Sequence, residues 1–246
     1  MTLLLRIDWA PDATEASVVD IAARSTLTSA RETHHPAGAG HDVDRWLRAA
    51  TVASRAALDS LVVIGPSADD IRFVELRTAA PGGLIALDAD GAPLHDALLG
   101  DHPESAADAD WLVGHLDGGA DAWIDASGVV PTAGSTVALL SYLHRTDSAA
   151  WDAMVRCTVP IGLLAERLGA RPTIGVHDGV GTAVADRRAP LTWRVDLLAV
   201  VDGSREWNAA LPAIVDGAEP IGVLDAATAG ALGVRTSTPL HIGSIV

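Results

Sequence analysis

Two carboxylates four positions apart flank the first turn that the sequence predicts. Asp8 ends a run in which apolar residues alternate with others, and Asp12 follows Trp9-Ala10-Pro11. Together the two carboxylates could hold a divalent cation, because such cations prefer oxygen ligands. The other interpretation is a plain turn after a strand, since Asp and Pro are both frequent in turns. We favour the plain turn.

The histidines and the cysteine form no recognisable catalytic or metal motif. Nine histidines include His34-His35 and His41, but no spacing matches a zinc site. The single cysteine, Cys157, excludes an internal disulfide and a Cys-rich metal centre. No Gly-x-Ser-x-Gly sequence is present either. We therefore expect no metal site in this chain.

Composition limits the class of partner. The 246 residues carry a net charge of −15, and every basic residue is arginine. Such a surface repels phosphate backbones, so nucleic acid and anionic membranes are poor partners. The N-terminus becomes charged too early for a signal peptide, and no apolar run approaches the ~18 residues of a membrane span. We expect a cytoplasmic protein with no nucleic-acid or membrane partner.

The hydrophobic pattern of the first third predicts a sheet that opens with antiparallel strands. Strands are predicted at residues 2–10, 16–23, 27–34, 71–79 and 83–88. The clearest helix is predicted at residues 42–61, because apolar residues recur there at spacings of three and four. Asp42 is its expected N-cap. A sheet with a helix packed on it indicates an α/β domain.

The rest of the chain predicts mainly helices. A helix over residues 105–124 is interrupted at Gly118-Gly119. Further helices are predicted at residues 136–144, 149–155, 161–168, 191–200, 206–211 and 226–232, with short strands at 221–224 and 240–242. Residues 175–188 are expected to form a loop. No repeat or Pro/Ser linker divides the chain, so residues 1–246 are predicted to form one domain.

Three patches of sequence, taken with the order of the elements, carry a resemblance. They are Arg6-Ile7-Asp8, Gly83–Asp101 and Leu211–Gly243, and residues 137–154 add a matching helix pair. The chain resembles the N-terminal domain of the FGGY carbohydrate kinases over essentially its whole length. The resemblance implies the ribonuclease-H-like, actin-like ATPase fold. That is an α/β lobe with a mixed five-stranded sheet, helices and a helical insertion.

The resemblance implies an altered phosphate turn. The family's Asp-x-Gly-Thr-Ser corresponds to Asp8–Asp12, where Ala, Pro and Asp replace Gly, Thr and Ser. Proline removes a backbone N–H, and Asp12 adds a negative charge where phosphate would lie. The family's catalytic base is expected at Val246, which accepts no proton. We predict no catalytic residue here, and ATP and Mg only if a second, nucleotide-binding lobe is supplied.

The resemblance also implies where a sugar or polyol would bind. The family's Gly-Gln-x-His-Gly loop corresponds to residues 79–83, which keep only the final glycine, and its Trp-Asn-Asp corresponds to residues 100–102. A later aspartate corresponds to a family segment near the sugar cleft. The candidate sugar-binding residues are therefore Gly82, Gly83, Asp101, His102 and Asp178. Ordinary solvated loop residues are the other interpretation.

These departures lead to two functional hypotheses. The first is a homologue of the sugar-binding lobe that is inactive by itself and acts by binding or assembly. The alternative is one half of a split or truncated, xylulokinase-like sugar kinase. We expect a homodimer or a separate protein partner, because the apolar segments at Gly82–Leu87 and residues 240–246 would form an exposed patch in the isolated lobe.

Overall fold

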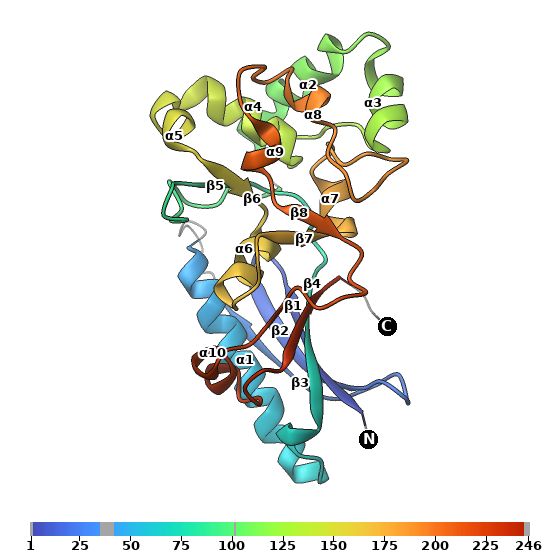
Figure 1. Ribbon diagram of the computed structural model, residues 1–246, viewed down its shortest axis with the longest axis vertical. Coiled ribbons are helices and arrows are strands. Elements are labelled where there is room, and N and C mark those ends of the chain that lie inside the picture. Colours follow the sequence, from blue (N-terminus) through green and yellow to red (C-terminus); the bar gives the residue numbers. More distant parts are fainter. Residues whose placement is uncertain (1, 35–41, 101, 244–246) are drawn as a thin grey trace. The chain divides into compact units, whose positions relative to one another are not determined.

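An antiparallel hairpin opens the chain and leads into its largest sheet (Figure 1). The computed structural model describes residues 2–34, 42–100 and 102–243. The first three strands are β1 (Leu3–Trp9), β2 (Ala13–Asp20) and β3 (Ser25–Thr33). β2 pairs antiparallel with both β1 and β3. β1 and β2 consist mostly of buried residues, whereas β3 has none. This pattern places β3 at the edge of the sheet.

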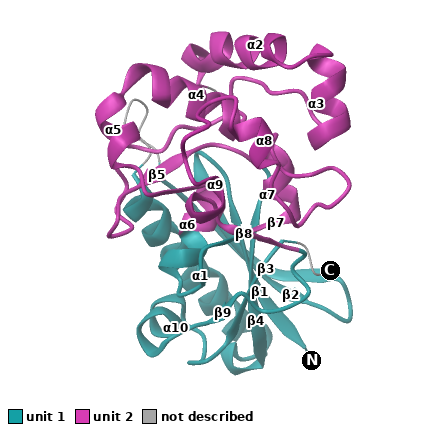
Figure 2. Ribbon diagram, turned by 45° about the horizontal axis from the view of Figure 1, so that its top comes forward, with its two compact units in different colours: residues 1–80, 164–173, 216–246 teal, residues 81–163, 174–215 magenta. Residues whose placement is uncertain are grey.

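The chain divides into two units, which Figure 2 colours separately. Unit 1 comprises residues 1–80, 164–173 and 216–246, and unit 2 comprises residues 81–163 and 174–215. Because both are assembled from discontinuous segments, the division does not fall at a single point of the chain. The assignment of residues 1–246 to one domain stays a prediction.

Unit 1 contains a mixed sheet in the order β3-β2-β1-β4-β10-β9. Its later strands are β4 (Ile71–Thr78), which is preceded by a 3-10 turn at Ala68–Asp70, β9 (Gly222–Val223) and β10 (Pro239–Ile242). β4 runs parallel to β1 and to β10, and β9 is antiparallel to β10. The sheet has one strand more than the five expected, and the two-residue β9 lies at its edge.

Helix α1 (Val43–Ile64) packs on the opening hairpin. Asp42 caps it, because its carboxylate accepts the backbone N–H two residues on, and Gly65 ends it with φ of 103°. The apolar face predicted from the sequence is buried against β1, β2 and β3. In its first turn the ring of Trp46 lies edge-on to Trp9, with 4.9 Å between centroids. α10 (Ala226–Leu232) contacts α1.

A charged pair lies inside the unit 1 sheet. The register of β1 and β4 places Arg6 beside Glu75, and Arg6 Nε donates to Glu75 Oε2 at 2.7 Å. The Glu75 side chain is fully buried, so it requires such a partner. His241 of β10 is the register neighbour of Glu75 on the other side. The pair connects the two parallel strands at the centre of the sheet.

Unit 2 is mainly helical. Its helices are α2 (Ala106–His115), α3 (Gly119–Ser127), α4 (Thr136–Thr146), α5 (Ser148–Ala153), α7 (Val176–Gly181), α8 (Val195–Leu198) and α9 (Trp207–Ala210), with a 3-10 turn at Pro103–Ser105. Two strand pairs accompany them, β5 (Ile85–Leu87) with β6 (Arg156–Thr158) and β7 (Thr173–Gly175) with β8 (Ala213–Val215). The chain passes between the units within α6 (Pro160–Arg167) and β7. Trp123, Trp151 and Trp207 are buried in one core.

Two expectations from the sequence are wrong. Residues 176–181, expected as loop, form α7. The apolar segments expected to be exposed are instead covered: Leu84, Ile85, Leu87 and Ile242 have no exposed surface, because they belong to or adjoin the paired strands β5 and β10. The rest of the second segment, residues 244–246, lies outside the described residues. Self-association stays a prediction without that patch as its basis.

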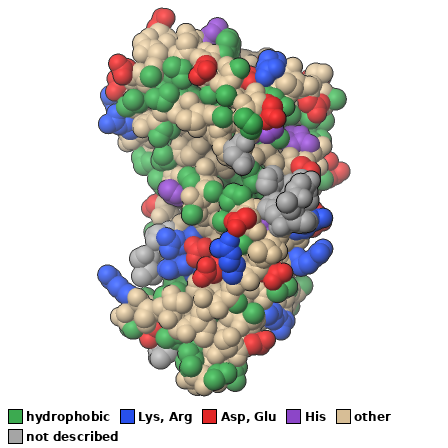
Figure 3. Space-filling model, turned by 180° about the vertical axis from the view of Figure 1, so that it is seen from behind, with side chains coloured by type: hydrophobic (Ala, Val, Ile, Leu, Met, Phe, Trp, Pro, Cys, Tyr) green, Lys and Arg blue, Asp and Glu red, His purple; other side chains and the backbone are tan. Residues whose placement is uncertain are grey.

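The surface carries mixed charge on a net-acidic chain. On the face shown in Figure 3, acidic and arginine side chains are interspersed with apolar and neutral ones. The net charge of the whole sequence is −15. Among the described residues, no helix is long and apolar enough to cross a membrane. The cytoplasmic location stays a prediction.

Candidate functional site

The first pair of candidates flanks the turn between β1 and β2, with Asp8 near the end of β1 and Asp12 just before β2. A buried tryptophan anchors the turn. Trp9 closes β1 and is 1% exposed, because its ring packs against Trp46 of α1. Ala10 N–H donates to the carbonyl of Ala13 at 2.9 Å, which closes the turn. Pro11 between them has no N–H to donate. Two of the turn's backbone donors are therefore spent or absent.

Each of these two carboxylates has an arginine beside it. Asp12 Oδ2 lies 2.6 Å from Nη2 of Arg31 on β3, and Asp8 Oδ1 lies 3.9 Å from Nε of Arg77 on β4. Partial burial raises the pKa of the Asp8 carboxyl, and the charges of Arg77 and Arg6 oppose that rise. Among the described residues, no group of three His, Cys, Asp or Glu side chains could hold a metal ion.

This turn is not suited to binding ATP phosphates or Mg²⁺. Phosphate oxygens need outward-facing donors, and here the Ala10 N–H is used internally, Pro11 has none, and Asp12 presents an anion. A cation would have to compete with Arg31 for Asp12 and with Arg77 for Asp8. The residues at this turn therefore do not fit either group.

In unit 2, the Gly82–Gly83 loop packs against two other segments. Both glycines have positive φ, 97° and 86°, a conformation that favours glycine. A Cβ on Gly82 would lie 2.9 Å from the carbonyl oxygen of Gly181 at the end of α7 and 3.0 Å from that of Gly134. Gly83 N–H donates to the Gly134 carbonyl at 3.2 Å. Because these glycines have no side chain, the backbones of the loop, the end of α7 and the segment before α4 can pack directly against one another.

His102 follows a second point at which two backbone segments pack closely. A Cβ on Gly134 would overlap the carbonyl of Gly100, so the turn that holds His102 adjoins the same backbone cluster. The His102 ring meets Tyr142 of α4 edge-on at 4.7 Å, and its Nδ1 is 3.8 Å from Glu104 Oε2. Its buried Nε2 has no hydrogen-bond partner among the described residues. Asp101 and Val246 lie outside the described residues.

Asp178 is a buried acid in the first turn of α7. Only 3% of its surface is exposed, and its Oδ2 accepts the N–H of Gly175 at 3.1 Å. Its Oδ1 has no partner in the part of the chain that the structure describes. Burial raises the pKa of the Asp178 carboxyl to about 7, although the N–H of Gly175 opposes the rise. The group can therefore exchange a proton near neutral pH.

The candidates thus separate into two groups. Gly82, Gly83, His102 and Asp178 belong to unit 2, and close contacts between backbone segments join the loops that carry the first three to α7. Asp8 and Asp12 belong to unit 1. Sequence reasoning missed Gly134 and Gly181 as points of close approach. The neighbouring Gly175 and Gly179 could have drawn attention to Gly181, whereas Gly134 stands alone in its segment.

Comparison with known proteins settles the family. The model of the FGGY family of carbohydrate kinases, N-terminal domain, matches residues 13–245. This chain belongs to that family. The match begins one residue after Asp12, so the altered turn lies outside it. The resemblance inferred from the sequence is confirmed.

Relatives of this FGGY domain are xylulose kinases. The xylulose kinase of Streptomyces coelicolor is 31% identical over 183 residues, which cover 73% of this chain and 36% of that protein. The xylulose kinase of Streptomyces rubiginosus has the same identity and coverage. The chain therefore spans well under half the length of the curated relatives it matches.

Solved structures establish the fold of this FGGY domain. The xylulose kinase from Rhodospirillum rubrum has a TM-score of 0.83 at 18% identity and covers 98% of this chain and 48% of its own. The gluconate kinase from Lactobacillus acidophilus has a TM-score of 0.83 at 16% identity, with 99% and 48% covered. The actin-like fold predicted from the sequence is confirmed.

Proposed function

We propose that this FGGY N-terminal domain acts by binding or assembly and does not support phosphoryl transfer through its first turn. The observation that carries the proposal is the turn between β1 and β2. Ala10 N–H is bonded to Ala13, Pro11 lacks an N–H, and Asp12 carries a negative charge. Catalysis of phosphoryl transfer depends on positioning and on stabilising negative charge. With two backbone donors unavailable and a carboxylate beside them, this turn is poorly suited to both tasks.

Binding of a small sugar or polyol would use the cluster in unit 2. Asp178 Oδ1 and His102 Nε2 are buried polar atoms without a hydrogen-bond partner among the described residues. Buried polar atoms of this kind cost ~1–3 kcal/mol each unless a ligand or water satisfies them. A hydroxyl-rich ligand can donate to the carboxylate and accept from the imidazole. Xylulose, named by the relatives, is the first sugar to test.

The alternative is that the domain supplies the sugar side of an ATP-dependent kinase together with a second domain. The observation that favours it is length, because this chain covers 36% of the Streptomyces coelicolor xylulose kinase and the family model is that of an N-terminal domain. ATP and Mg²⁺ would then be held mainly by the second domain. The two proposals differ in whether the turn between β1 and β2 is compatible with phosphoryl transfer.

A turn exchange tests the proposal directly. The β1–β2 turn of the Streptomyces coelicolor xylulose kinase is replaced by Asp8–Asp12 of this chain. We expect kcat to fall by ~100-fold or more, because removing a single oxyanion donor commonly costs ~10²–10³. KM for xylulose should stay within a few-fold. The matched control exchanges the β2–β3 turn, residues 21–24, and should leave kcat within about twofold.

The outcomes separate the hypotheses. A kcat that survives the exchange shows that this turn permits phosphoryl transfer, which supports the two-domain kinase and contradicts our proposal. Titration of xylulose into the 246-residue chain is a separate test of the sugar cluster. If the Asp178→Asn variant binds xylulose more weakly than the unsubstituted chain, the result supports that site. Equal affinity in the two proteins would place the sugar elsewhere.

A further inference from the structure

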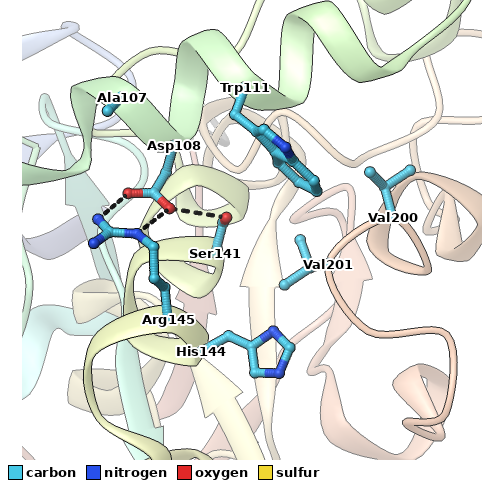
Figure 4. A pocket seen from close by; sticks show the side chains of 8 residues that line it. All are labelled: Ala107, Asp108, Trp111, Ser141, His144, Arg145, Val200 and Val201. Carbon is cyan, nitrogen blue, oxygen red and sulfur yellow. Dashed lines mark hydrogen bonds and ion pairs between the residues drawn. The ribbon is translucent and has the colours of Figure 1, made fainter.

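Unit 2 holds a pocket that the family assignment leaves unused (Figure 4). Its volume is about 570 Å³, within the range of small-molecule sites. It lies where α2 and α4 meet the segment after α8. Its lining residues are Ala107, Asp108, Trp111, Ser141, His144, Arg145, Val200 and Val201. All of them belong to unit 2.

One wall of the pocket is a fixed charged network. Asp108 is 5% exposed, and its carboxylate accepts from Arg145 Nη2 at 2.8 Å, from Arg145 Nε at 3.2 Å and from Ser141 Oγ at 3.1 Å. These contacts fix the plane of the guanidinium, as Figure 4 shows. Arg145 Nη1 donates to none of the described residues, so its two protons remain for another acceptor.

The opposite wall is aromatic and apolar. Trp111 is 45% exposed, which is high for the largest apolar side chain, and in Figure 4 its indole points toward Val200 and Val201. The His144 ring stacks on Trp151 with 4.4 Å between centroids, which fixes its orientation at the pocket mouth. An indole face beside two valines suits a flat apolar group.

The lining does not suit a sugar. Each hydroxyl of a polyol donates one hydrogen bond and can accept two, so a sugar site needs acceptors as well as donors. The one carboxylate of the pocket, Asp108, already accepts three hydrogen bonds. The guanidinium of Arg145 is the permanent cation of the lining, and a charge-assisted hydrogen bond to it favours an acceptor that carries negative charge. The pocket therefore differs in chemistry from the cluster around Asp178.

We propose that this pocket binds a small aromatic carboxylate, with its ring between Trp111 and the valines and its carboxylate on Arg145. The ligand's flat ring covers the exposed indole. Its carboxylate accepts from the guanidinium of Arg145, whose position the Asp108 pair holds. An anion at this point meets no unpaired carboxylate of the lining.

Calorimetric titration with 2-naphthoate tests the proposal on the 246-residue chain. For a probe of this size we expect a Kd of about 1 mM or tighter. Trp111→Ala should abolish measurable binding, and Arg145→Gln should weaken it by ~10-fold or more, because a hydrogen bond to a charged group is lost. The neutral 2-naphthylmethanol should bind more weakly and respond to Trp111→Ala alone.

Arg187→Gln is the matched control. Its side chain is similarly exposed and lies 3.7 Å from Asp125, away from the pocket, so binding should not change. Arg145→Gln leaves Asp108 with Ser141 alone and could unfold the protein, whereas Trp111→Ala keeps the ion pair intact. Equal Kd values in the unsubstituted chain and in Trp111→Ala, or no binding of 2-naphthoate, would overturn the proposal. Loss with Trp111→Ala but not with Arg145→Gln would overturn the carboxylate assignment.

Discussion

Asp12 Oδ2 lies 2.6 Å from Nη2 of Arg31, in an ion pair that reaches from the first turn to β3. The two side chains are 67% and 54% exposed. Ion pairs that face solvent contribute only ~0–1 kcal/mol, because water screens them and their side chains lose entropy. The pair therefore determines the charge and geometry of the turn far more than the stability of the fold.

Removing this carboxylate should leave the fold intact. Asp12→Ser is expected to change the free energy of unfolding by less than ~1 kcal/mol, measured by urea denaturation. Arg31→Gln, which removes the other partner, should have an effect of the same small size. A loss above ~2 kcal/mol for either variant would show that the turn depends on the pair for its structure.

The buried acid of α7 should make stability depend on pH. Burial raises the pKa of Asp178 from 3.8 to about 7, so between these values the folded state binds a proton that the unfolded state has released. Stability from this group is therefore present below pH ~4 and is lost as pH rises toward ~7. Asp178→Asn should be more stable than the unsubstituted chain at pH 8, by ~1–4 kcal/mol.

Urea denaturation at pH 5 and pH 8 measures this difference. Asp186→Asn is the control of opposite sign, because backbone N–H groups of Arg188 and Ala189 lower the pKa of Asp186. Removing that carboxylate should destabilise the protein at neutral pH. If Asp178→Asn gave a difference that did not change with pH, the acid would be ionised in the folded state, contrary to its burial.

Close packing of backbone should make Gly134 intolerant of a side chain. A Cβ there would overlap the carbonyl of Gly100, so Gly134→Ala forces backbone to move and should cost ~1–3 kcal/mol. Gly114 in α2 has open space around it, and Gly114→Ala should be neutral or stabilise by ~0.5–1 kcal/mol. Thermal unfolding of the two variants checks this pair, and equal melting temperatures would contradict the contact.

The indole of Trp9, just before the first turn, should contribute more to the stability of the fold than the side chains of the turn itself. Trp9 is 1% exposed and packs edge-on to Trp46, so Trp9→Ala should destabilise the protein by ~3–5 kcal/mol. Trp111→Ala, which removes an indole that is 45% exposed, should cost much less. Guanidinium denaturation compares them. Similar losses for both would mean that the Trp9 ring is not part of the core.

Elements with local signals were predictable from the sequence. The bounds of α10, residues 226–232, are those expected, because the Asp225 carboxylate accepts the N–H of Thr228 and Gly233 takes positive φ just past the helix. α1 likewise follows from Asp42 and its apolar stripe. The three-residue strands β6, β7 and β8 were missed, because each is defined by distant pairing and is too short for a periodicity.

The location of the candidate residues in unit 2 was predictable in part. Their glycine loop follows from the family resemblance, but the sequence does not predict α7, because Gly175, Gly179 and Gly181 weaken any helical pattern. Tertiary packing reverses that preference: a Cβ on Gly179 would lie 3.2 Å from Ile214 Cδ1 of β8. The Asp108–Arg145 pair gave no sequence signal, since its partners are 37 residues apart on two helices.

Sugar-dependent ATP turnover tests the central claim most directly. The assay compares the 246-residue chain with the same protein purified from its natural cells together with any chain bound to it. Xylulose, other pentuloses, hexuloses, glycerol and gluconate serve as acceptors. The altered first turn predicts background turnover in both preparations. A rate near the ~1–100 s⁻¹ of ordinary kinases in either preparation would contradict the account.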